Sequence, residues 1–161
     1  MNLISPLLPE SNVLLDVDVS SKKRVFEQVG LLFENNHQIA RSVVFDSLFA
    51  REKLGSTGLG QGIAIPHGRI KGLKDAVGAF VRMKQPIPFD APDGQNVGLI
   101  FVLLVPERAS DLHLQILSEL AQMFSNKPLR ERLLAARSPA ELHQLIADWQ
   151  PNASTQHSPV V

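Results

Sequence analysis

Apolar residues recur at helical spacing in two stretches of the first third of the chain. The first pattern begins after Ser20 and Ser21, either of which can cap a helix, and we expect that helix to end near residues 35–36. The second pattern covers residues 42–54, and Gly55 stands where a glycine commonly ends a helix. Both stretches are therefore predicted to be amphipathic helices.

The helical period returns after Pro106. Apolar residues from Asp111 onward share one helical face, and the Asp111 side chain can cap that helix. A short further helix is expected over residues 126–137. Ser138 and Glu141 then form a capping box for a last helix, with a proline at its first position. The C-terminal third is therefore predicted to be mainly helical.

Four other stretches have the composition of strands. Residues 13–17 read as extended chain, and residues 63–65 as a short buried strand. Residues 76–83 and 97–105 give stronger signals, and the unbroken hydrophobicity of 97–105 indicates a central strand that is buried on both faces. The turn-rich residues 88–94 connect these two strands in the manner of a hairpin.

This alternation predicts an α/β fold, with a mixed central sheet flanked by helices on both faces. A chain of 161 residues, of which 44% are apolar, suffices for one hydrophobic core. We therefore expect a single domain over residues 1–150. Residues 151–161 lack periodicity and have little to bury, so we expect them to form a disordered tail.

Residues 55–62 contain four glycines, which favours a loop with unusual backbone angles over a helix or a strand. Gly58, Gly60 and Gly62 resemble part of a dinucleotide-binding fingerprint. That fingerprint requires a strand before the glycines and a helix after them, whereas here a helix comes first and a strand follows. No Walker lysine follows either, so we reject a nucleotide site.

Composition narrows the classes of function. The 16 Lys and Arg residues balance the 16 Asp and Glu residues, so there is no basic field to hold nucleic acid. Cysteine is absent, which excludes disulfides and thiolate sites and fits a reducing compartment. The longest apolar run, residues 97–105, is about half of the ~20 residues that a membrane-spanning helix needs. We expect a cytoplasmic protein without nucleic-acid binding or membrane insertion.

Among five histidines, His67 stands apart. It follows a short buried strand and Pro66 and precedes Gly68, so we expect a stiff turn to display it at the end of the strand. This display suits a group that is presented to another protein, because a bulky neighbour would block the approach. On position alone, a structural turn histidine is the alternative.

Two further residues can join His67. His113 falls in the first turn of the helix after the central strand, where ligands usually bind in α/β sheets, and it can face the same crevice. Its alternative is a helix-start histidine that bonds a nearby carbonyl. Arg51, at the end of the second helix, can hold a phosphoryl oxygen with its guanidinium fork, or it can be a solvated residue at a helix end.

The other histidines, His37, His143 and His157, are expected to be solvated surface or tail residues. A metal site with two histidines is a minority alternative. Asp111 is close to His113 in sequence, yet residues two apart on a helix do not face the same way. We therefore expect neither a metal nor a cofactor.

The segment from Glu52 to Gly68 carries a longer pattern. An acidic residue is followed by six free positions, an aliphatic and a small residue, two free positions, and then Ile-Ala-Ile-Pro-His-Gly. This segment resembles the phosphorylation-site signature of mannitol/fructose-type EIIA domains of the phosphoenolpyruvate-dependent phosphotransferase system, and every constrained position is met. His113 matches the second landmark of that family at the expected distance.

The resemblance covers roughly residues 5–149 and implies the mannitol-type EIIA fold. It implies that His67 accepts a phosphoryl group on Nε2 while a backbone carbonyl holds Nδ1. It also implies that His113 and Arg51 stabilise the phosphoryl oxygens without a metal. The implied donor is an HPr-type phosphocarrier protein, which a phosphoenolpyruvate-dependent enzyme I charges.

Within the family, the chain is similar to the free-standing nitrogen-regulatory EIIA, because nothing in it resembles the membrane-spanning or phosphocarrier modules of many sugar-specific members. Such a protein regulates its targets by its phosphorylation state, and potassium-transport proteins and sensor kinases are the targets that the resemblance suggests. The alternatives are a sugar-specific EIIA that relays phosphate to an EIIB and a phosphate-independent protein-binding regulator. A metal-dependent hydrolase is a third alternative, which the lack of clustered carboxylates beside the histidines disfavours.

Overall fold

A mixed six-stranded sheet forms the centre of the computed structural model, which describes residues 2–108 and 110–151. The strand order is β1-β5-β6-β3-β2, and β4 also pairs with β6. The strands are β1 (Val13–Val17), β2 (Gly58–Gly60), β3 (Ile63–Ala64), β4 (His67–Ile70), β5 (Val77–Ile87) and β6 (Val97–Pro106). Except for Pro151, the tail that was expected to be disordered lies outside the described residues.

Strand β6 joins the two halves of the sheet. It runs antiparallel to β5, where Phe80 lies opposite Phe101, and parallel to β3 and β4. Most of its side chains are buried, whichever face they point to. The prediction of a mixed sheet with residues 97–105 as a strand buried on both faces is therefore confirmed.

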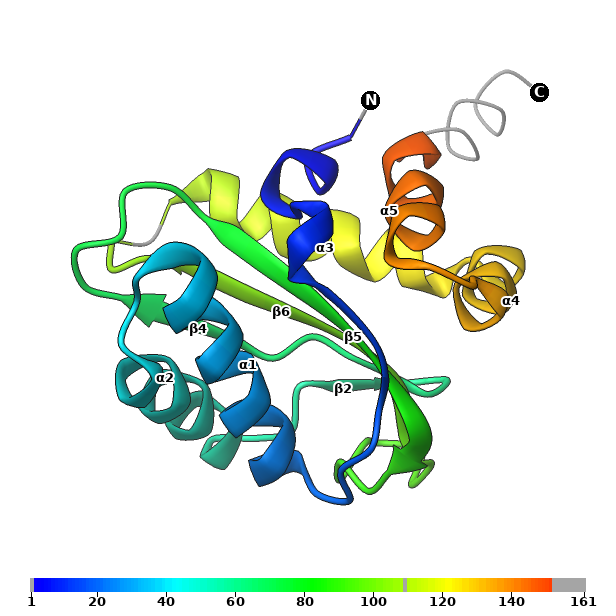
Figure 1. Cartoon of the computed structure of the whole chain (residues 1–161), viewed down its shortest axis with the longest axis horizontal. Helices are drawn as coiled ribbons and strands as arrows, with labels where there is room; N and C mark the ends of the chain where they lie inside the picture. The colour runs from blue at the N-terminus through cyan, green and yellow to red at the C-terminus, as the bar shows by residue number, and fades with distance from the viewer. Residues whose placement is uncertain (1, 109, 152–161) are drawn as a thin grey trace.

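Helices cover both faces of this sheet, as Figure 1 shows. On one face lie α1 (Lys22–His37) and α2 (Arg41–Lys53); on the other lie α3 (Asp111–Ser125), α4 (Lys127–Ala135) and α5 (Pro139–Asp148). Two 3-10 turns, η1 (Ser5–Leu7) and η2 (Glu10–Asn12), precede β1. The predicted α/β class and the helix positions are confirmed to within one or two residues at most ends.

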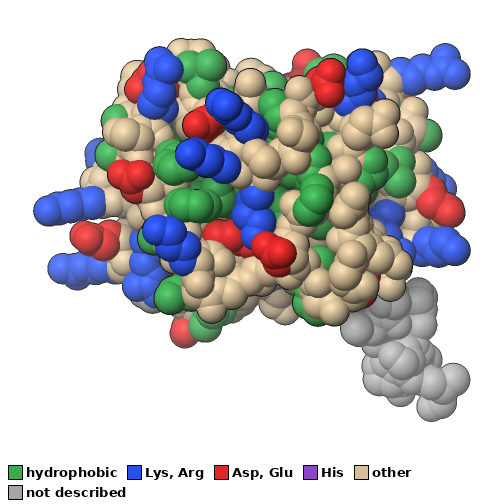
Figure 2. Space-filling model, turned by 90° about the horizontal axis from the view of Figure 1, so that it is seen from below, with side chains coloured by type: hydrophobic (Ala, Val, Ile, Leu, Met, Phe, Trp, Pro, Cys, Tyr) green, Lys and Arg blue, Asp and Glu red, His purple; other side chains and the backbone are tan. Residues whose placement is uncertain are grey.

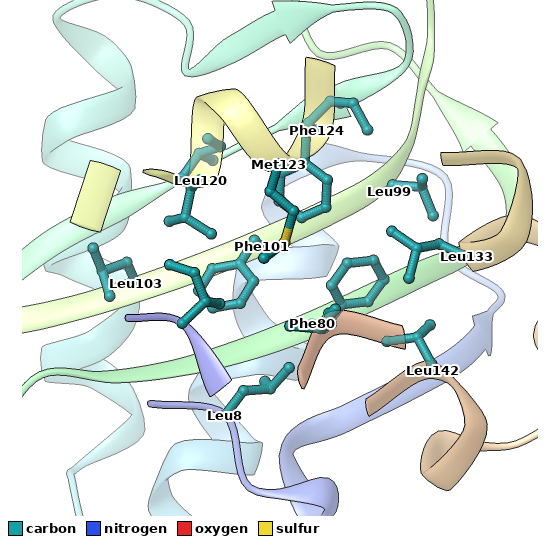
Figure 3. Packing of buried hydrophobic residues seen from close by; sticks show 14 of the residues in the cluster. Leu8, Phe80, Leu99, Phe101, Leu103, Leu120, Met123, Phe124, Leu133 and Leu142 are labelled. Carbon is teal, nitrogen blue, oxygen red and sulfur yellow. The ribbon is translucent and has the colours of Figure 1, made fainter. Parts of the chain in front are cut away.

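Each face of the sheet has its own apolar layer. Successive strand residues point to opposite faces, so Phe80 packs on one side and Val81 on the other. Figure 3 shows the layer under α3, where Phe80 and Phe101 both contact the ring of Phe124. The opposite layer contains the buried Phe33 of α1. The apolar runs in the sequence therefore report burial on two sides.

Polar side chains cap the N-terminal ends of α1, α3, α4 and α5, whereas α2 begins after Ala40 without a side-chain cap. The predicted caps at Ser21 and Ser138 are confirmed. At α3 the prediction was wrong, because Ser110 and not Asp111 is the cap: the Ser110 Oγ accepts the His113 backbone N–H at 3.4 Å. Asp111 is instead the first helical residue, where a carboxylate interacts favourably with the positive end of the helix dipole.

The glycine-rich residues 55–62 are not wholly the predicted loop. Residues 58–60 form β2, which pairs with β3 in antiparallel fashion. A Cβ on Gly58 would lie 2.9 Å from the Cβ of Ala91, so a larger residue would push these segments apart. Unusual backbone angles are present as expected, with positive φ at Gly55, Gly60 and Gly62.

The surface has no single dominant charge on the side seen in Figure 2. Both basic and acidic side chains are spread over this side, with apolar side chains between them. Such a mixture is what the equal numbers of 16 basic and 16 acidic residues predict. Over residues 2–108 and 110–151, no helix is long and apolar enough to cross a membrane.

Candidate functional site

An open pocket of about 690 Å³ lies between the C-terminal end of α2 and the N-terminal end of α3. Three residues that the sequence singled out line it together: Arg51 from α2, His67 from β4 and His113 from α3. Leu103 of β6 forms part of its wall. The expectation that His67 and His113 face one crevice is therefore confirmed.

His67 is the first residue of β4 and not the last residue before a turn. It pairs with Leu103, and the carbonyl of Pro66 accepts the Leu103 backbone N–H at 2.9 Å. The prediction that His67 stands at a strand end was thus right for β3, but it missed β4. Strand pairing with β6 fixes the backbone of His67 on its C-terminal side as firmly as Pro66 does on the other.

The ring of His67 is held in one orientation by a backbone group. Its Nδ1 lies 2.9 Å from the carbonyl oxygen of Ile65. A carbonyl oxygen only accepts hydrogen bonds, so Nδ1 carries the proton and donates. In the neutral imidazole the lone pair then belongs to Nε2. This bond is the backbone contact that the family resemblance implied.

Burial keeps the imidazole of His67 neutral. Removal from water is the largest cause that lowers its pKa below the ordinary 6.5, and the positive charge of Arg51 acts in the same direction. The bond to the Ile65 carbonyl and the charge of Glu52 oppose the shift without reversing it. At neutral pH the ring is therefore a neutral base with a free Nε2 lone pair.

Gly68 has a packing role besides the predicted one. The sequence suggested that its small size leaves the approach to His67 open, and Gly68 does line the pocket beside His67. It is also buried and faces α2, where an added Cβ would overlap the side chain of Ser47 and come within 3.1 Å of the Ser47 Cβ. The glycine therefore allows β4 to pack closely on α2.

Arg51 occupies the last turn of α2. Its Nη1 donates to the carbonyl of Gly55 at 2.8 Å, which holds the half-buried guanidinium at the edge of the pocket. A guanidinium has five N–H donors, so this one bond leaves capacity for an anion. The residue therefore combines a local structural bond with a place at the site.

His113 enters the pocket from the first turn of α3. Its backbone N–H is satisfied by the Ser110 cap, but its ring Nδ1 is buried and has no hydrogen-bond partner among the described residues. The predicted alternative, a ring bonded to a nearby carbonyl, finds no support there. A buried polar atom without a partner is costly and typically marks a site that a water or a ligand completes.

Arg69 also lines this pocket, and the sequence reading missed it. It lies two residues after His67 in β4, so the alternation of a strand places both side chains on one face. Recognition of β4 would have predicted this, but a four-residue strand that begins with histidine and glycine carries a weak signal.

The remaining histidines lie away from the pocket. His37 is not merely solvated as expected: its Nε2 accepts a hydrogen bond from Nδ2 of the buried Asn12 at 2.8 Å, and burial lowers its pKa. His143 is half-buried, and His157 lies outside the described residues. Within the described ranges, no group of three or more His, Cys, Asp or Glu side chains could hold a metal ion.

Comparison with known proteins agrees with the geometry. Residues 6–149 match the family model described as the phosphoenolpyruvate-dependent sugar phosphotransferase system, EIIA 2. The chain is 41% identical to the nitrogen regulatory protein of Pseudomonas aeruginosa over 148 residues, which is 91% of this chain and 96% of that protein.

Two solved structures have the same fold. The nitrogen regulatory protein IIA-Ntr from Neisseria meningitidis matches with a TM-score of 0.85 and 54% identity over 90% of this chain and 99% of its own. IIA mannitol from Escherichia coli matches with a TM-score of 0.72 and 22% identity over 86% of this chain and 97% of its own, which confirms the mannitol-type fold. The chain therefore belongs to the EIIA 2 family of the phosphoenolpyruvate-dependent sugar phosphotransferase system, and it is of the nitrogen-regulatory type that the sequence predicted.

Proposed function

We propose that this protein accepts a phosphoryl group on Nε2 of His67 from an HPr-type phosphocarrier in the cytoplasm and regulates target proteins by its phosphorylation state. One observation carries the proposal: the bond from Nδ1 to the Ile65 carbonyl leaves the Nε2 lone pair of His67 as the nucleophile in an open pocket. The family and the similarity to nitrogen regulatory proteins support the same reading.

The transfer step balances without a metal or an added base. The Nε2 lone pair of His67 forms the new N–P bond as the N–P bond of the phosphorylated carrier histidine breaks. The leaving nitrogen of the carrier keeps the electron pair of the broken bond. Nδ1 of His67 keeps its proton, so the phosphorylated ring of His67 takes up a formal positive charge, and the carrier ring, protonated on its other nitrogen while phosphorylated, becomes neutral as the group leaves. Catalysis then consists mainly of aligning the two nitrogens with the phosphorus.

Groups around the pocket offset the charge that arrives. The phosphoryl group brings roughly −1.5 to −2 charges if it resembles other phosphorylated side chains. Arg51 donates charge-assisted hydrogen bonds to its oxygens, and the ring of His113 donates another. The N-terminal end of α3 also favours an anion, although the carboxylate of Asp111 at the same end opposes this.

The rim of the pocket provides the contact surface for the carrier. Leu54 is 84% exposed, Leu114 is 67% exposed, and both line the pocket. Exposed leucines around a reactive group favour docking of a protein partner. Addition of a phosphoryl dianion between them changes the charge of this surface, so the phosphorylated and free forms bind different targets. Potassium-transport proteins and sensor kinases are the targets to test first.

The experiment is phosphorylation of the purified protein. It is incubated with phosphoenolpyruvate, enzyme I and an HPr-type carrier, and its intact mass is measured under alkaline conditions, where phosphohistidine survives. We expect the gain of one phosphoryl group in the wild type and none in His67→Ala. His143→Ala, which changes a histidine outside the pocket, is the matched control and should gain the group. No gain in the wild type with several carriers would leave a phosphate-independent binding module.

A further inference from the structure

Glu52 carries a buried carboxylate at an unfavourable position in its helix. Its side chain is 3% exposed, and it lies in the last turn of α2, where a negative charge opposes the helix dipole. A buried charge is tolerated only when it is paired and hydrogen-bonded. Three donors meet this need: Nζ of Lys22 at 3.0 Å, and the backbone N–H and Oγ1 of Thr57 at 2.9 and 2.6 Å.

The Thr57 end of this cluster leads to His67 through two further hydrogen bonds. The carbonyl of Thr57 accepts the backbone N–H of Ile65 at 3.0 Å. The carbonyl of Ile65 in turn accepts Nδ1–H of His67 at 2.9 Å. Both Thr57 and Ile65 are buried, at 6% and 4% exposed, so water does not compete for these bonds. A continuous chain of bonds therefore joins Glu52 to the imidazole.

We propose that Glu52 and Thr57 are positioning residues that hold the ring of His67 in the tautomer and orientation needed for phosphoryl transfer. The carboxylate of Glu52 fixes Thr57, Thr57 fixes the backbone at Ile65, and the Ile65 carbonyl fixes Nδ1. This role rests on the proposed function for its effect on transfer, but the effect on the tautomer does not depend on it. Neither side chain touches the reacting Nε2, so neither is a catalytic residue.

The cluster is built for rigidity. Thr57 uses both its backbone and side-chain donors on one carboxylate, which restrains the chain more than one bond would. Lys22 supplies the countercharge and also lies 4.6 Å from the centre of the Phe89 ring. It thereby ties the start of α1 to the end of α2. An error of 1 Å in the placement of a reacting group can cost about 100-fold in rate, which is why such support matters.

The test compares Glu52→Gln and Thr57→Val with the wild type. In Glu52→Gln, an amide NH₂ group replaces one carboxylate oxygen. It cannot accept the hydrogen bonds that Lys22 and Thr57 donate there. Thr57→Val removes the hydroxyl with little change of shape, and Thr57→Ser restores it. We expect imidazole ¹⁵N NMR to show Nδ1–H alone in the wild type and in Thr57→Ser, and a mixture of tautomers in the other two variants. The kcat for phosphoryl transfer should fall about 10-fold in those two, with KM for the carrier little changed.

Glu119→Gln is the matched control. Glu119 is also a buried glutamate whose carboxylate accepts a backbone N–H, that of Leu3, but its bonds lead away from His67. It should lose stability as Glu52→Gln does while keeping the tautomer and the kcat. Unchanged tautomer and kcat in Thr57→Val would overturn the positioning role, even if Glu52→Gln failed to fold. If no carrier phosphorylates the wild type, the proposed function fails, and the NMR comparison still decides the role of Glu52 and Thr57.

Discussion

Gly68 of β4 packs directly against Ser47 of α2, and the space between them does not admit a side chain at position 68. A Cβ there would overlap the Ser47 side chain and approach the Ser47 backbone carbon to 3.3 Å. We therefore expect Gly68→Ala to lower the free energy of unfolding by about 1–3 kcal/mol, the usual cost of overpacking. Urea denaturation followed by circular dichroism measures this change.

A second substitution separates overpacking from other effects at position 68. Ser47→Ala removes the hydroxyl that meets the new Cβ, although it also loses the 2.9 Å bond from Ser47 Oγ to the Arg69 carbonyl. In the double variant, the penalty of Gly68→Ala should be smaller than in the wild-type background. Equal penalties in both backgrounds would show that the close contact with Ser47 is not the cause.

His113→Ala should slow phosphorylation of His67 and leave the fold intact. A hydrogen bond to a charged group contributes about 1.5–3 kcal/mol, which corresponds to a rate lower by roughly 10- to 100-fold. The variant also removes the buried Nδ1, which has no partner within residues 2–108 and 110–151, so the free energy of unfolding should fall only by the packing that the ring contributes. Mass spectrometry of samples quenched at successive times measures the rate. A rate equal to that of the wild type would show that His113 has only a structural role.

The pH dependence of phosphorylation should reflect the lowered pKa of His67. Burial, assisted by Arg51, disfavours the protonated ring, so its pKa lies below the ordinary 6.5. Only the neutral ring has a free Nε2 lone pair. The pH at which the initial rate at saturating carrier falls to half should therefore lie below 6.5, and the rate should change little between about pH 8 and pH 7.5. Loss of half the rate at or above pH 6.5 would contradict this, once spontaneous hydrolysis of the phosphorylated carrier is subtracted at each pH.

The sequence predicted those elements whose signals are local. The helices were predictable from apolar periodicity and from caps such as Ser21 and Ser138. The observed ends of α2 differ from the predicted ends by only one residue. The central strand was predictable because a run of apolar residues buried on both faces leaves no polar positions. The three candidate residues followed from the positions of their elements and from the family resemblance, although only His67 lies in the signature itself, and the structure brings all three to one pocket.

The missed features depend on partners that are distant in sequence. Strands β2 and β4 are short and rich in glycine, and they exist because they pair with β3 and β6. His37 was read as solvated because nothing local shows that Asn12, 25 residues earlier, donates to its ring. The tight contact between Gly68 and α2 likewise needs the packing of a helix on the sheet. Such features follow from tertiary structure and not from local pattern.

Arg82 provides a last test, because its guanidinium is an internal cap for the C-terminal end of α4. It is 8% exposed, and its Nη1 donates to the carbonyls of Leu133, Leu134 and Ala136 at 3.0, 3.2 and 2.6 Å. Arg82→Met keeps the apolar stem but leaves these carbonyls without their donor. We expect the free energy of unfolding in urea to fall by about 2–4 kcal/mol.

Arg82→Lys should recover only part of that loss, because an ammonium group lacks the planar fork that reaches the three carbonyls and Asp16 together. The matched control is Arg24→Met, since Arg24 is an exposed arginine of α1 that pairs with Glu27 three residues later. A surface pair of this kind contributes less than about 0.5 kcal/mol. An Arg82→Met variant that was no more destabilised than Arg24→Met would contradict this prediction. Water would then replace the hydrogen bonds of the guanidinium to the α4 carbonyls at no cost, and Arg82 would not stabilise the packing of α4 on the sheet.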